Sequence, residues 1–292
     1  MKQVIKIENL TYVYNSKTPF AKKALNGVDL QINEGDFLGI IGHTGSGKST
    51  LIQHLNGLLK PQSGALNVLG FDLFDKRIKK SYKELRSKVG MVFQYPEYQL
   101  FAENVFSDVA FGYKNFFNSK KNKLTKEEVE NAVRDALLLV GLNYDEVKDR
   151  SPFEISGGQK RRAALAGVIV SKPQILILDE PTAGLDPAGK AEILDLVHAL
   201  HKTCSHTIVM ISHDMDEIAK NCNKIALMEE GKILKVDAPE IIFSDAKKIK
   251  ELNLDLPNTV KIISDLKENG FDLGRNVFYE KELAELIAKK LR

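Results

Sequence analysis

Only two cysteines occur among the 292 residues, Cys204 and Cys222, and they do not show the CxxC spacing of a metal or redox site. A chain of this length can bury a sizeable core without disulfide bonds to hold it together. The scarcity of cysteine therefore excludes the small disulfide-rich secreted class and favours a reducing compartment.

Long apolar runs are also missing. No stretch approaches the roughly 20 apolar residues that a membrane-spanning helix needs. The first ten residues, MKQVIKIENL, lack the apolar segment of a secretory leader. We therefore expect any role at a membrane to be peripheral.

The chain has little excess of either charge. Lys and Arg number 42 against 39 Asp and Glu, which gives a net charge of +3. This value is too small to indicate nucleic acid as an obligatory partner. The local basic runs KRIKK at residues 76–80 and KKNK at residues 120–123 are typical of solvated faces. Hydrophobic residues make up 43% and charged residues 28% of the chain, which is ordinary for a globular protein.

Short strands alternate with helices along much of the chain. Residues 3–41 hold short runs of alternating apolar and polar residues, which predict several strands. Further on, the apolar runs ILILD and TIVMI alternate with helical patterns at residues 158–170 and 187–201. This order is typical of a parallel sheet whose strands are covered on both faces. The pattern predicts an α/β fold.

Two regions depart from this alternation. A polar and mostly helical region between Val105 and Val140 predicts a helical subdomain inserted into the sheet domain, with an exposed connector at residues 118–128. After Phe243 a charged tail holds two amphipathic stretches, at residues 259–269 and 280–291. Basic and acidic residues in the tail are nearly balanced, which argues against a basic membrane-binding segment. We expect the two stretches to pack on the rest of the chain or to stabilise a dimer.

The segment GHTGSGKST at residues 42–50 matches the phosphate-binding pattern G-x-x-x-x-G-K-[ST], after a predicted strand and before a helical pattern that runs to Leu59. Glycines let backbone N–H groups surround phosphates, Lys48 supplies positive charge at the β and γ oxygens, and Ser49 offers a hydroxyl to Mg²⁺. The residues predicted to bind ATP here are Gly42, His43, Thr44, Gly45, Ser46, Gly47, Lys48, Ser49 and Thr50.

Two further motifs carry chemistry. The run ILILDE ends a predicted strand with two carboxylates, of which Asp179 can hold Mg²⁺ through water and Glu180 could polarise an attacking water. In ISGGQ, the small residues that begin with Ser156 open a predicted helix, and such a helix start attracts anions. The chain therefore holds a second candidate anion site beside its phosphate-binding segment.

These motifs carry a family resemblance. GHTGSGKST, the glutamine of VFQYPEYQLF, ISGGQ, ILILDEPTAGLD and ISHD follow one another in the order found in ATP-binding cassette (ABC) ATPases. The usual LSGGQ is changed only at Ile155. The resemblance implies a P-loop NTPase cassette at residues 1–243, with an N-terminal antiparallel β subdomain, a parallel-sheet core and a helical subdomain at about residues 95–170. Residues 244–292 would form a helical tail.

The resemblance also implies roles for single residues. Glu180 would activate the attacking water, Gln94 would touch that water and Mg²⁺, and His213 would hydrogen-bond the γ-phosphate. Tyr14 would stack on adenine, with Tyr12 as the competing choice. The residues expected around Mg²⁺ are Ser49, Gln94 and Asp179, the last through water.

In this family two cassettes pack head to tail, so the helix that begins at Ser156 would face the nucleotide of the partner. ATP-driven closure and opening after hydrolysis would then form a two-state switch. The residues expected to act on the partner's nucleotide are Ser156, Gly157, Gly158, Gln159 and Asp186.

A finer resemblance, carried by VFQYPEYQLF, SPFEISGGQKRRAALAG and DEPTAGLDP, is to the ATPase of energy-coupling factor (ECF) transporters. His43 and PEYQLF favour the second ATPase component of such systems. The resemblance implies an ATP hydrolase at the cytoplasmic face of the cell membrane that powers uptake of vitamins or transition-metal ions. Its partners would be a second homologous ATPase in a heterodimer, a transmembrane coupling protein and a substrate-binding membrane component, with no nucleic acid. A conventional ABC transporter ATPase and a soluble ABC switch acting on a macromolecule remain the alternatives.

For two sets of side chains, the sequence allows either contact with a partner protein or contacts within the chain. The large groups that follow Gln94 have the composition of an interface anchor, and also of internal packing. They are Tyr95, Tyr98, Leu100 and Phe101. Arg161 and Arg162, one helical turn past ISGGQ, would contact the coupling protein or pair with nearby carboxylates.

Overall fold

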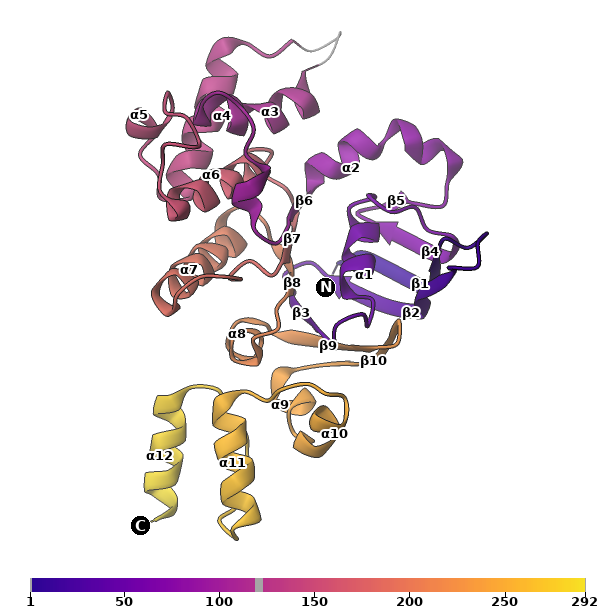
Figure 1. Cartoon of the computed structure of the whole chain (residues 1–292), viewed down its shortest axis with the longest axis vertical. Coiled ribbons are helices and arrows are strands. Elements are labelled where there is room, and N and C mark those ends of the chain that lie inside the picture. The colour runs from indigo at the N-terminus through magenta and orange to yellow at the C-terminus, as the bar shows by residue number, and fades with distance from the viewer. Residues whose placement is uncertain (1, 119–122, 292) are drawn as a thin grey trace. The chain divides into compact units, whose positions relative to one another are not determined.

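The computed structural model describes residues 2–118 and 123–291 (Figure 1). Residues 119–122, which belong to the expected connector and to the basic run at 120–123, lie outside this description. The chain forms two compact units. Unit 1 comprises Met1–His54, Lys60–Asn67 and Val209–Arg292, and unit 2 comprises Leu55–Leu59 and Val68–Ile208.

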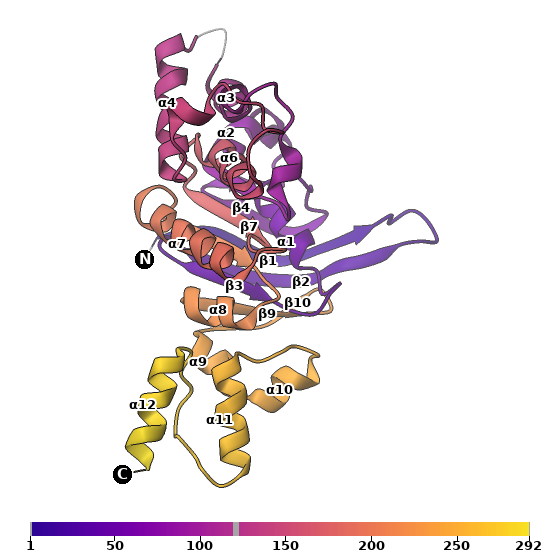
Figure 2. The same ribbon diagram turned by 60° about the vertical axis from the view of Figure 1, so that its left-hand side comes forward.

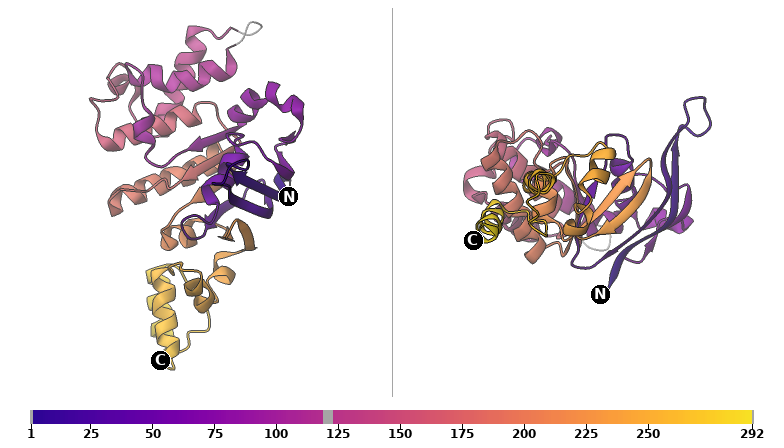
Figure 3. Two further views of the ribbon diagram at one scale, coloured as in Figure 1. Left: turned by 45° about the vertical axis from the view of Figure 1, so that its right-hand side comes forward. Right: turned by 90° about the horizontal axis from the view of Figure 1, so that it is seen from below.

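Unit 1 begins with a long hairpin. β1 (Gln3–Tyr14) and β2 (Lys22–Asn33) pair antiparallel, and β4 (Ser63–Val68) lies on the other side of β1. Alternate apolar side chains such as Ile5, Ile7 and Leu30 are buried, because successive residues of a strand point to opposite faces. Figures 2 and 3 show the two long strands running together to an exposed turn. The expected N-terminal antiparallel sheet is confirmed.

The remaining strands of unit 1 lead to the phosphate-binding segment. β3 (Phe37–Ile41) is buried along its whole length and pairs in parallel with β9 (Lys224–Glu229), which pairs antiparallel with β10 (Lys232–Asp237). Within unit 1 the strand order is β10, β9, β3 and then the end of β8 (Thr207–Ile211). Since β3 ends at Ile41, it places Gly42 at the carboxyl edge of the sheet, where α/β proteins bind ligands.

Three short helices and one longer pair follow β8 in the described part of unit 1. They are α8 (Met215–Asn221), α9 (Pro239–Ile242), α10 (Ala246–Glu251), α11 (Asn258–Glu268) and α12 (Glu280–Lys290). α11 and α12 lie side by side (Figure 1), and Ile263, Leu273, Val277 and Leu283 form a buried cluster between and beside them. The two amphipathic stretches expected in the tail are therefore both helices.

The tail contacts α8 through polar groups. The carboxylate of Asp216 accepts hydrogen bonds from the backbone and side-chain nitrogens of Asn258, at 3.1 and 2.6 Å. Lys220 donates to Glu280 at 2.7 Å, and the hydroxyl of Tyr279 donates to the carbonyl of Lys220. The starts of α11 and α12 are thus attached to the helix that follows the ISHD motif.

Unit 2 contains the helical subdomain and two parallel strands. Its helices are the 3-10 helices η1 (Lys76–Lys80) and η2 (Pro96–Gln99), and α2 (Tyr82–Lys88), α3 (Val105–Phe117), α4 (Lys126–Leu139), α5 (Tyr144–Val147), α6 (Gly157–Ile169) and α7 (Pro187–Thr203). α3 and α4 pack on α6 and on each other. β6 (Val89–Val92) pairs in parallel with β7 (Ile175–Asp179). Short β5 (Phe71–Asp72) precedes η1.

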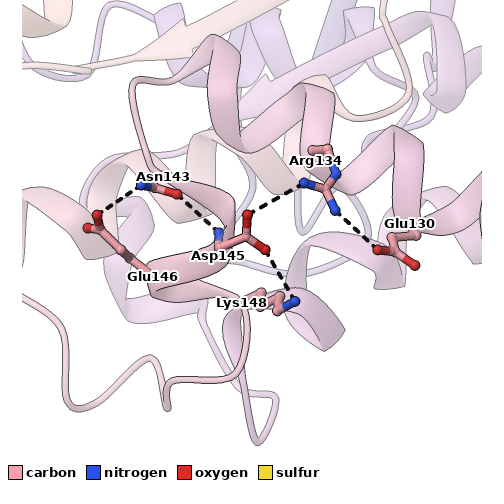
Figure 4. Close-up of polar contacts among 6 residues, drawn as sticks. All are labelled: Glu130, Arg134, Asn143, Asp145, Glu146 and Lys148. Atoms are coloured by element: carbon pink, nitrogen blue, oxygen red, sulfur yellow. Dashed lines mark hydrogen bonds and ion pairs between the residues drawn. The ribbon is translucent and has the colours of Figure 1, made fainter.

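Ionic contacts orient α5 against α4 (Figure 4). Arg134 lies 3.2 Å from a carboxylate oxygen of Glu130 and 3.7 Å from one of Asp145, which also accepts from Lys148 at 3.3 Å. The side chain of Asn143 caps α5 by accepting from the backbone N–H of Asp145. Exposed pairs of this kind contribute about 0–1 kcal/mol each, so they fix direction more than they stabilise the fold.

The helix expected from Lys48 to Leu59 is too long by four residues, since α1 is Lys48–Leu55. Gly57 has a backbone φ of +69°, a left-handed conformation that commonly ends helices. The side chain of Asn56 also donates to the carbonyl of Val89 at 2.7 Å and holds the chain in this turn. In the described ranges, no helix is both long and apolar enough to cross a membrane.

Leu283→Ala tests whether the tail helices depend on their own small core. Leu283 is 5% exposed, and loss of such a side chain costs about 2–5 kcal/mol. We expect faster amide hydrogen exchange in α11 and α12, with β3 and β9 unchanged, because local units open separately. Glu285→Ala, at an exposed position of α12, is the control. Equal exchange rates in α11 and α12 for the two variants would contradict this role.

Candidate functional site

The phosphate loop, residues 42–50, is closed by its own lysine. Nζ of Lys48 donates to the carbonyl of Gly42 at 2.6 Å and to that of His43 at 3.0 Å. Lys48 is only 6% exposed, so its ammonium group lies inside the turn that the loop makes. The arrangement brings a fixed positive charge to a ring of backbone groups at the start of α1, where helix N–H groups favour anions.

The path of the phosphate loop requires glycine at two positions. A Cβ on Gly42 would lie 2.3 Å from the carbonyl oxygen of Met228 in β9. Gly47 has a φ of +106°, and a Cβ there would lie 2.5 Å from the carbonyl oxygen of Ala24 in β2. Neither position can hold a larger residue without backbone movement. The loop is therefore seated directly on the backbones of β2 and β9.

A pocket of about 190 Å³ opens beside the phosphate loop. Its lining residues are Tyr14, Lys22, Ala24, Gly45, Gly47, Lys48, Ser49 and Thr50. The hydroxyl of Tyr14 lies 3.3 Å from Oγ1 of Thr50. Tyr12 instead packs edge-on against Tyr14 and His54, with ring centroids 4.9 and 4.8 Å apart. Of the two competing tyrosines, only Tyr14 is among the residues that line this pocket.

The chemistry of this pocket fits a nucleotide. A Cβ added at Gly45 would meet no described atom within 4 Å, which leaves room above the loop for phosphate oxygens. Lys48 offers a cation, Ser49 and Thr50 offer hydroxyls, and Tyr14 offers an aromatic wall. Backbone N–H groups with a lysine and a hydroxyl are the set that surrounds triphosphates in phosphate loops.

His213 borders a second pocket of about 670 Å³ that also contains His43 and Thr44 of the phosphate loop. His213 lies two residues past the end of β8, at the carboxyl end of that strand. Burial lowers the pKa of His213, and the positive charge of Lys48 lowers it further. The imidazole is therefore neutral at pH 7 and can donate one hydrogen bond.

Two carboxylates lie at the carboxyl end of β7 in unit 2, Asp179 as its last residue and Glu180 directly after it. The first four residues of β7 are buried, and Asp179 at its tip is half-buried. Glu180 has a φ of +53°, a left-handed backbone conformation that is uncommon for glutamate. Such strain persists only where the surroundings hold it, and it concentrates at functional sites. The chain then turns through hydrogen bonds from Ala183 to Glu180 and from Leu185 to Thr182.

The signature segment, residues 156–159, starts α6 as expected. The hydroxyl of Ser156 accepts from the backbone N–H of Gln159 at 3.2 Å, and the side chain of Gln159 accepts from the N–H of Ser156 at 3.0 Å. This is a reciprocal capping box. Gly157 and Gly158 are exposed, and a Cβ at either would meet no described atom within 4 Å. The helix start is therefore open to a group from outside the chain.

Asp186 and Gln94 are both exposed. The side chain of Asp186 accepts from the N–H of Gly189 at 2.9 Å and so caps α7, a local role that the sequence interpretation missed. The signal was present, because aspartate before proline at a helix start is a common cap. Gln94 directly precedes Tyr95, whose φ of +54° is left-handed.

The predicted site residues divide between the two units. Unit 1 brings together Tyr14, the phosphate loop and His213. Unit 2 holds Gln94, Ser156, Gly157, Gly158, Gln159, Asp179, Glu180 and Asp186.

The large side chains after Gln94 differ in exposure. Tyr98 is 83% and Phe101 is 62% exposed, whereas Leu100 is 7% exposed and belongs to the core. The ring of Phe101 meets that of Phe111 edge-on at 5.0 Å. Internal packing therefore holds for Leu100, and Tyr98 and Phe101 present an aromatic surface.

Both arginines past the signature segment pair within unit 2, as one of the two interpretations held. Arg162 donates to Glu192 at 2.7 Å and to the carbonyl of Val140 at 2.8 Å. Arg161 donates to the carbonyl of Ala183 and lies 3.8 Å from Glu97.

Comparison with known proteins adds an independent finding. The model of the ABC transporter family matches residues 25–183. The energy-coupling factor transporter ATP-binding protein EcfA2 of Clostridium tetani is 47% identical over 290 residues, 98% of each chain. The EcfA2 protein of Clostridioides difficile is also 47% identical, over 98% of this chain and 97% of its own length. The similarity thus extends beyond the cassette into the tail.

Solved structures agree. CbiO1 of Clostridium perfringens, described as part of the ABC transporter complex CbiONQ, matches with a TM-score of 0.73 and 36% identity, over 90% of this chain and 100% of its own. A bacterial ABC transporter cassette solved as a dimer matches with a TM-score of 0.70 and 27% identity, over 80% of this chain and 98% of its own. The cassette architecture expected from the motifs is confirmed.

Lys48→Ala tests the phosphate loop. The change removes the ammonium group that donates to the carbonyls of Gly42 and His43 and, with it, the positive charge that it offers to phosphate. We expect the dissociation constant for ATP, measured by titration calorimetry, to rise by at least about tenfold, as for loss of a charge-assisted hydrogen bond. Lys60→Ala, at an exposed position, should leave it unchanged. An unaltered ATP affinity in the Lys48 variant would remove Lys48 from the nucleotide site.

Proposed function

The chain belongs to the ABC transporter family, and we propose that it is the ATP-hydrolysing subunit of an energy-coupling factor importer. The observation that carries the proposal is the phosphate loop, in which Lys48 is held over two backbone carbonyls beside a pocket lined by Tyr14. The relatives with 47% identity over nearly the whole chain supply the transporter class.

ATP binding would use unit 1. Backbone N–H groups of the phosphate loop would surround the phosphates, with Lys48 at the β and γ oxygens. The ring of Tyr14 would stack on adenine, because Tyr14 lines the pocket and Tyr12, which packs edge-on against it, does not. Neutral His213 would donate a hydrogen bond to the γ-phosphate.

Bound Mg²⁺ would neutralise charge on the β and γ oxygens. Mg²⁺ prefers oxygen ligands. Unit 1 would offer the hydroxyl of Ser49. Unit 2 would offer the amide oxygen of Gln94 and, through water, the carboxylate of Asp179. For hydrolysis, the carboxylate of Glu180 would accept a proton from water as the water oxygen attacks the γ-phosphorus. The bond from that phosphorus to the β–γ bridging oxygen then breaks, and ADP and phosphate leave.

Catalysis would require a second ATPase. The signature segment lies at an exposed helix start whose glycines leave space for phosphate. We infer that it acts on the nucleotide held by a second, homologous ATPase, with Asp186 at the same interface. One of the matched cassettes was solved as a dimer, and ADP with phosphate was found in a related dimeric structure. Each nucleotide-binding site would thus be formed by residues of two chains.

The membrane partner would dock on the segment that follows Gln94. Tyr98 and Phe101 are exposed aromatic residues, and such residues anchor interfaces. We name residues 95–101 the docking segment, and we infer that it meets a transmembrane coupling protein at the cytoplasmic face. A substrate-binding membrane component would select the cargo, a vitamin or a transition-metal ion. CbiO1, which is part of a transporter complex, is 36% identical to this chain.

Glu180→Gln tests the hydrolytic role in the complex recovered by mild detergent extraction. The amide keeps the shape of the side chain but accepts no proton, so we expect kcat for ATP to fall by at least about 100-fold, with ATP affinity nearly unchanged. Glu127→Gln, in the exposed first turn of α4, is the control.

Two outcomes would contradict the proposal. Turnover by the Glu180 variant within a few-fold of wild type would remove Glu180 as the base. Recovery of the chain only in soluble complexes with RNA or DNA would favour the soluble switch over the importer subunit.

A further inference from the structure

Arg161 is a buried cation that touches two other segments of unit 2. It is 4% exposed, on the second turn of α6. Its Nη1 and Nη2 atoms both donate to the carbonyl of Ala183 at 3.1 Å. Its Nε atom lies 3.8 Å from Oε2 of Glu97, in η2. One guanidinium therefore links α6, the loop that follows Glu180 and the helix inside the docking segment.

The contact between Arg161 and Glu97 is incomplete. Nε of Arg161 and Oε2 of Glu97 are both buried, and neither has a hydrogen-bond partner among residues 2–118 and 123–291. Their separation of 3.8 Å is an ion-pair distance, but N–H···O hydrogen bonds are about 2.9 Å long. Buried charged groups without hydrogen bonds are costly. A small movement of η2 toward α6 would therefore gain a charge-assisted hydrogen bond.

A second contact joins the same segments. A Cβ on Gly184 would lie 3.1 Å from a ring carbon of Tyr95, so the ring rests against the loop that Arg161 also holds. Tyr95, Glu180 and Gly184 all have positive φ, at +54°, +53° and +75°. Backbone held in such conformations does not adjust freely. The docking segment and the loop after Glu180 thus meet at two points.

The docking segment has an inner and an outer side. Pro96 is buried, and Glu97 is largely buried, with 19% of its side chain exposed. Tyr98, the next residue along the chain, is 83% exposed. A partner that presses on Tyr98 would therefore act on Glu97 one residue away. Burial lowers the pKa of Arg161 while the charge of Glu97 raises it, which reflects the desolvation cost of keeping a cation here.

We propose that Arg161 is a positioning residue that couples the docking segment to the signature segment and to the loop after Glu180. The inference rests on the proposed function, in which residues 95–101 receive the coupling protein. Docking moves η2 toward α6 and closes Glu97 on Arg161. The shift reaches Ala183, three residues past Glu180, through the guanidinium, and reaches Ser156 through the rigid first turns of α6.

Arg161→Met tests the proposal in the complete membrane complex. Methionine fills similar space but cannot donate to Ala183 or attract Glu97. We expect the stimulation of ATP turnover by the membrane components to fall by about tenfold, the size expected of a residue that transmits coupling. The loss should appear in kcat, with KM for ATP within about twofold. Arg161→Lys, which keeps the charge, should restore part of the stimulation.

Glu97→Gln keeps the shape of the side chain and leaves the bonds from Arg161 to Ala183 in place. It should lose stimulation to a similar extent, and the double variant with Arg161→Met should lose little more, because residues of one network are not additive. Glu97→Gln alone decides the question if the Arg161 variants do not fold.

Arg162→Met is the matched control. Arg162 is the neighbouring residue and bonds to Glu192 and to the carbonyl of Val140, so its loss should lower the unfolding temperature and preserve stimulation. Full stimulation in both Arg161→Met and Glu97→Gln, or additive losses in the double variant, would overturn the coupling role of Arg161. Neither outcome would contradict the proposed function. If the wild-type chain formed no membrane complex at all, the proposed function would fail, and the inference with it.

Discussion

The close approach of the phosphate loop to β9 is the constraint on which the rest of the site depends. Gly42 follows β3 so near the carbonyl of Met228 that no side chain fits there. With the backbone fixed in this place, the carbonyls of Gly42 and His43 point at Nζ of Lys48. A buried ammonium held by neutral carbonyls keeps its charge available to an anion. A triphosphate bound here would therefore meet a cation that the loop already holds in place.

The two units carry complementary chemistry. Unit 1 supplies cation, hydroxyls and aromatic wall around the phosphate loop, and unit 2 supplies the carboxylates after β7 and the signature segment. The start of α6 is satisfied only locally, by the capping box between Ser156 and Gln159, and its glycines stay exposed. Under the proposed function, this exposed helix start would meet the phosphates of a nucleotide bound to another chain. The second anion site of the sequence would then belong to a pair of ATPases and would not duplicate the phosphate loop.

Much of the fold and of the candidate site could be predicted from motifs whose residues are contiguous in the sequence. The phosphate loop, β7 and the capped start of α6 depend on residues that are neighbours in sequence, so their local chemistry defines them. The predicted end of α1 at Leu59 was wrong, because Gly57 and the hydrogen bond from Asn56 to Val89 end the helix early. Only the three-dimensional pocket distinguishes Tyr14, which lines it, from Tyr12, which does not. Arg161 showed its partners only in three dimensions, since Glu97 and Ala183 come from separate segments.

Ser156→Arg is the most direct test of the central claim that each nucleotide is completed by two chains. A bulky cation at the start of α6 would block the phosphate surface offered to the partner. The measurement is photolabelling of the reconstituted complex with an azido-ATP analogue labelled on either the α- or the γ-phosphate, read separately on the two ATPases. The α-label reports bound nucleotide, and loss of the γ-label reports hydrolysis. We expect hydrolysis to stop at the nucleotide bound by the other ATPase, while ATP still binds to the phosphate loop of the variant chain. A variant that loses only its own nucleotide binding would contradict the account.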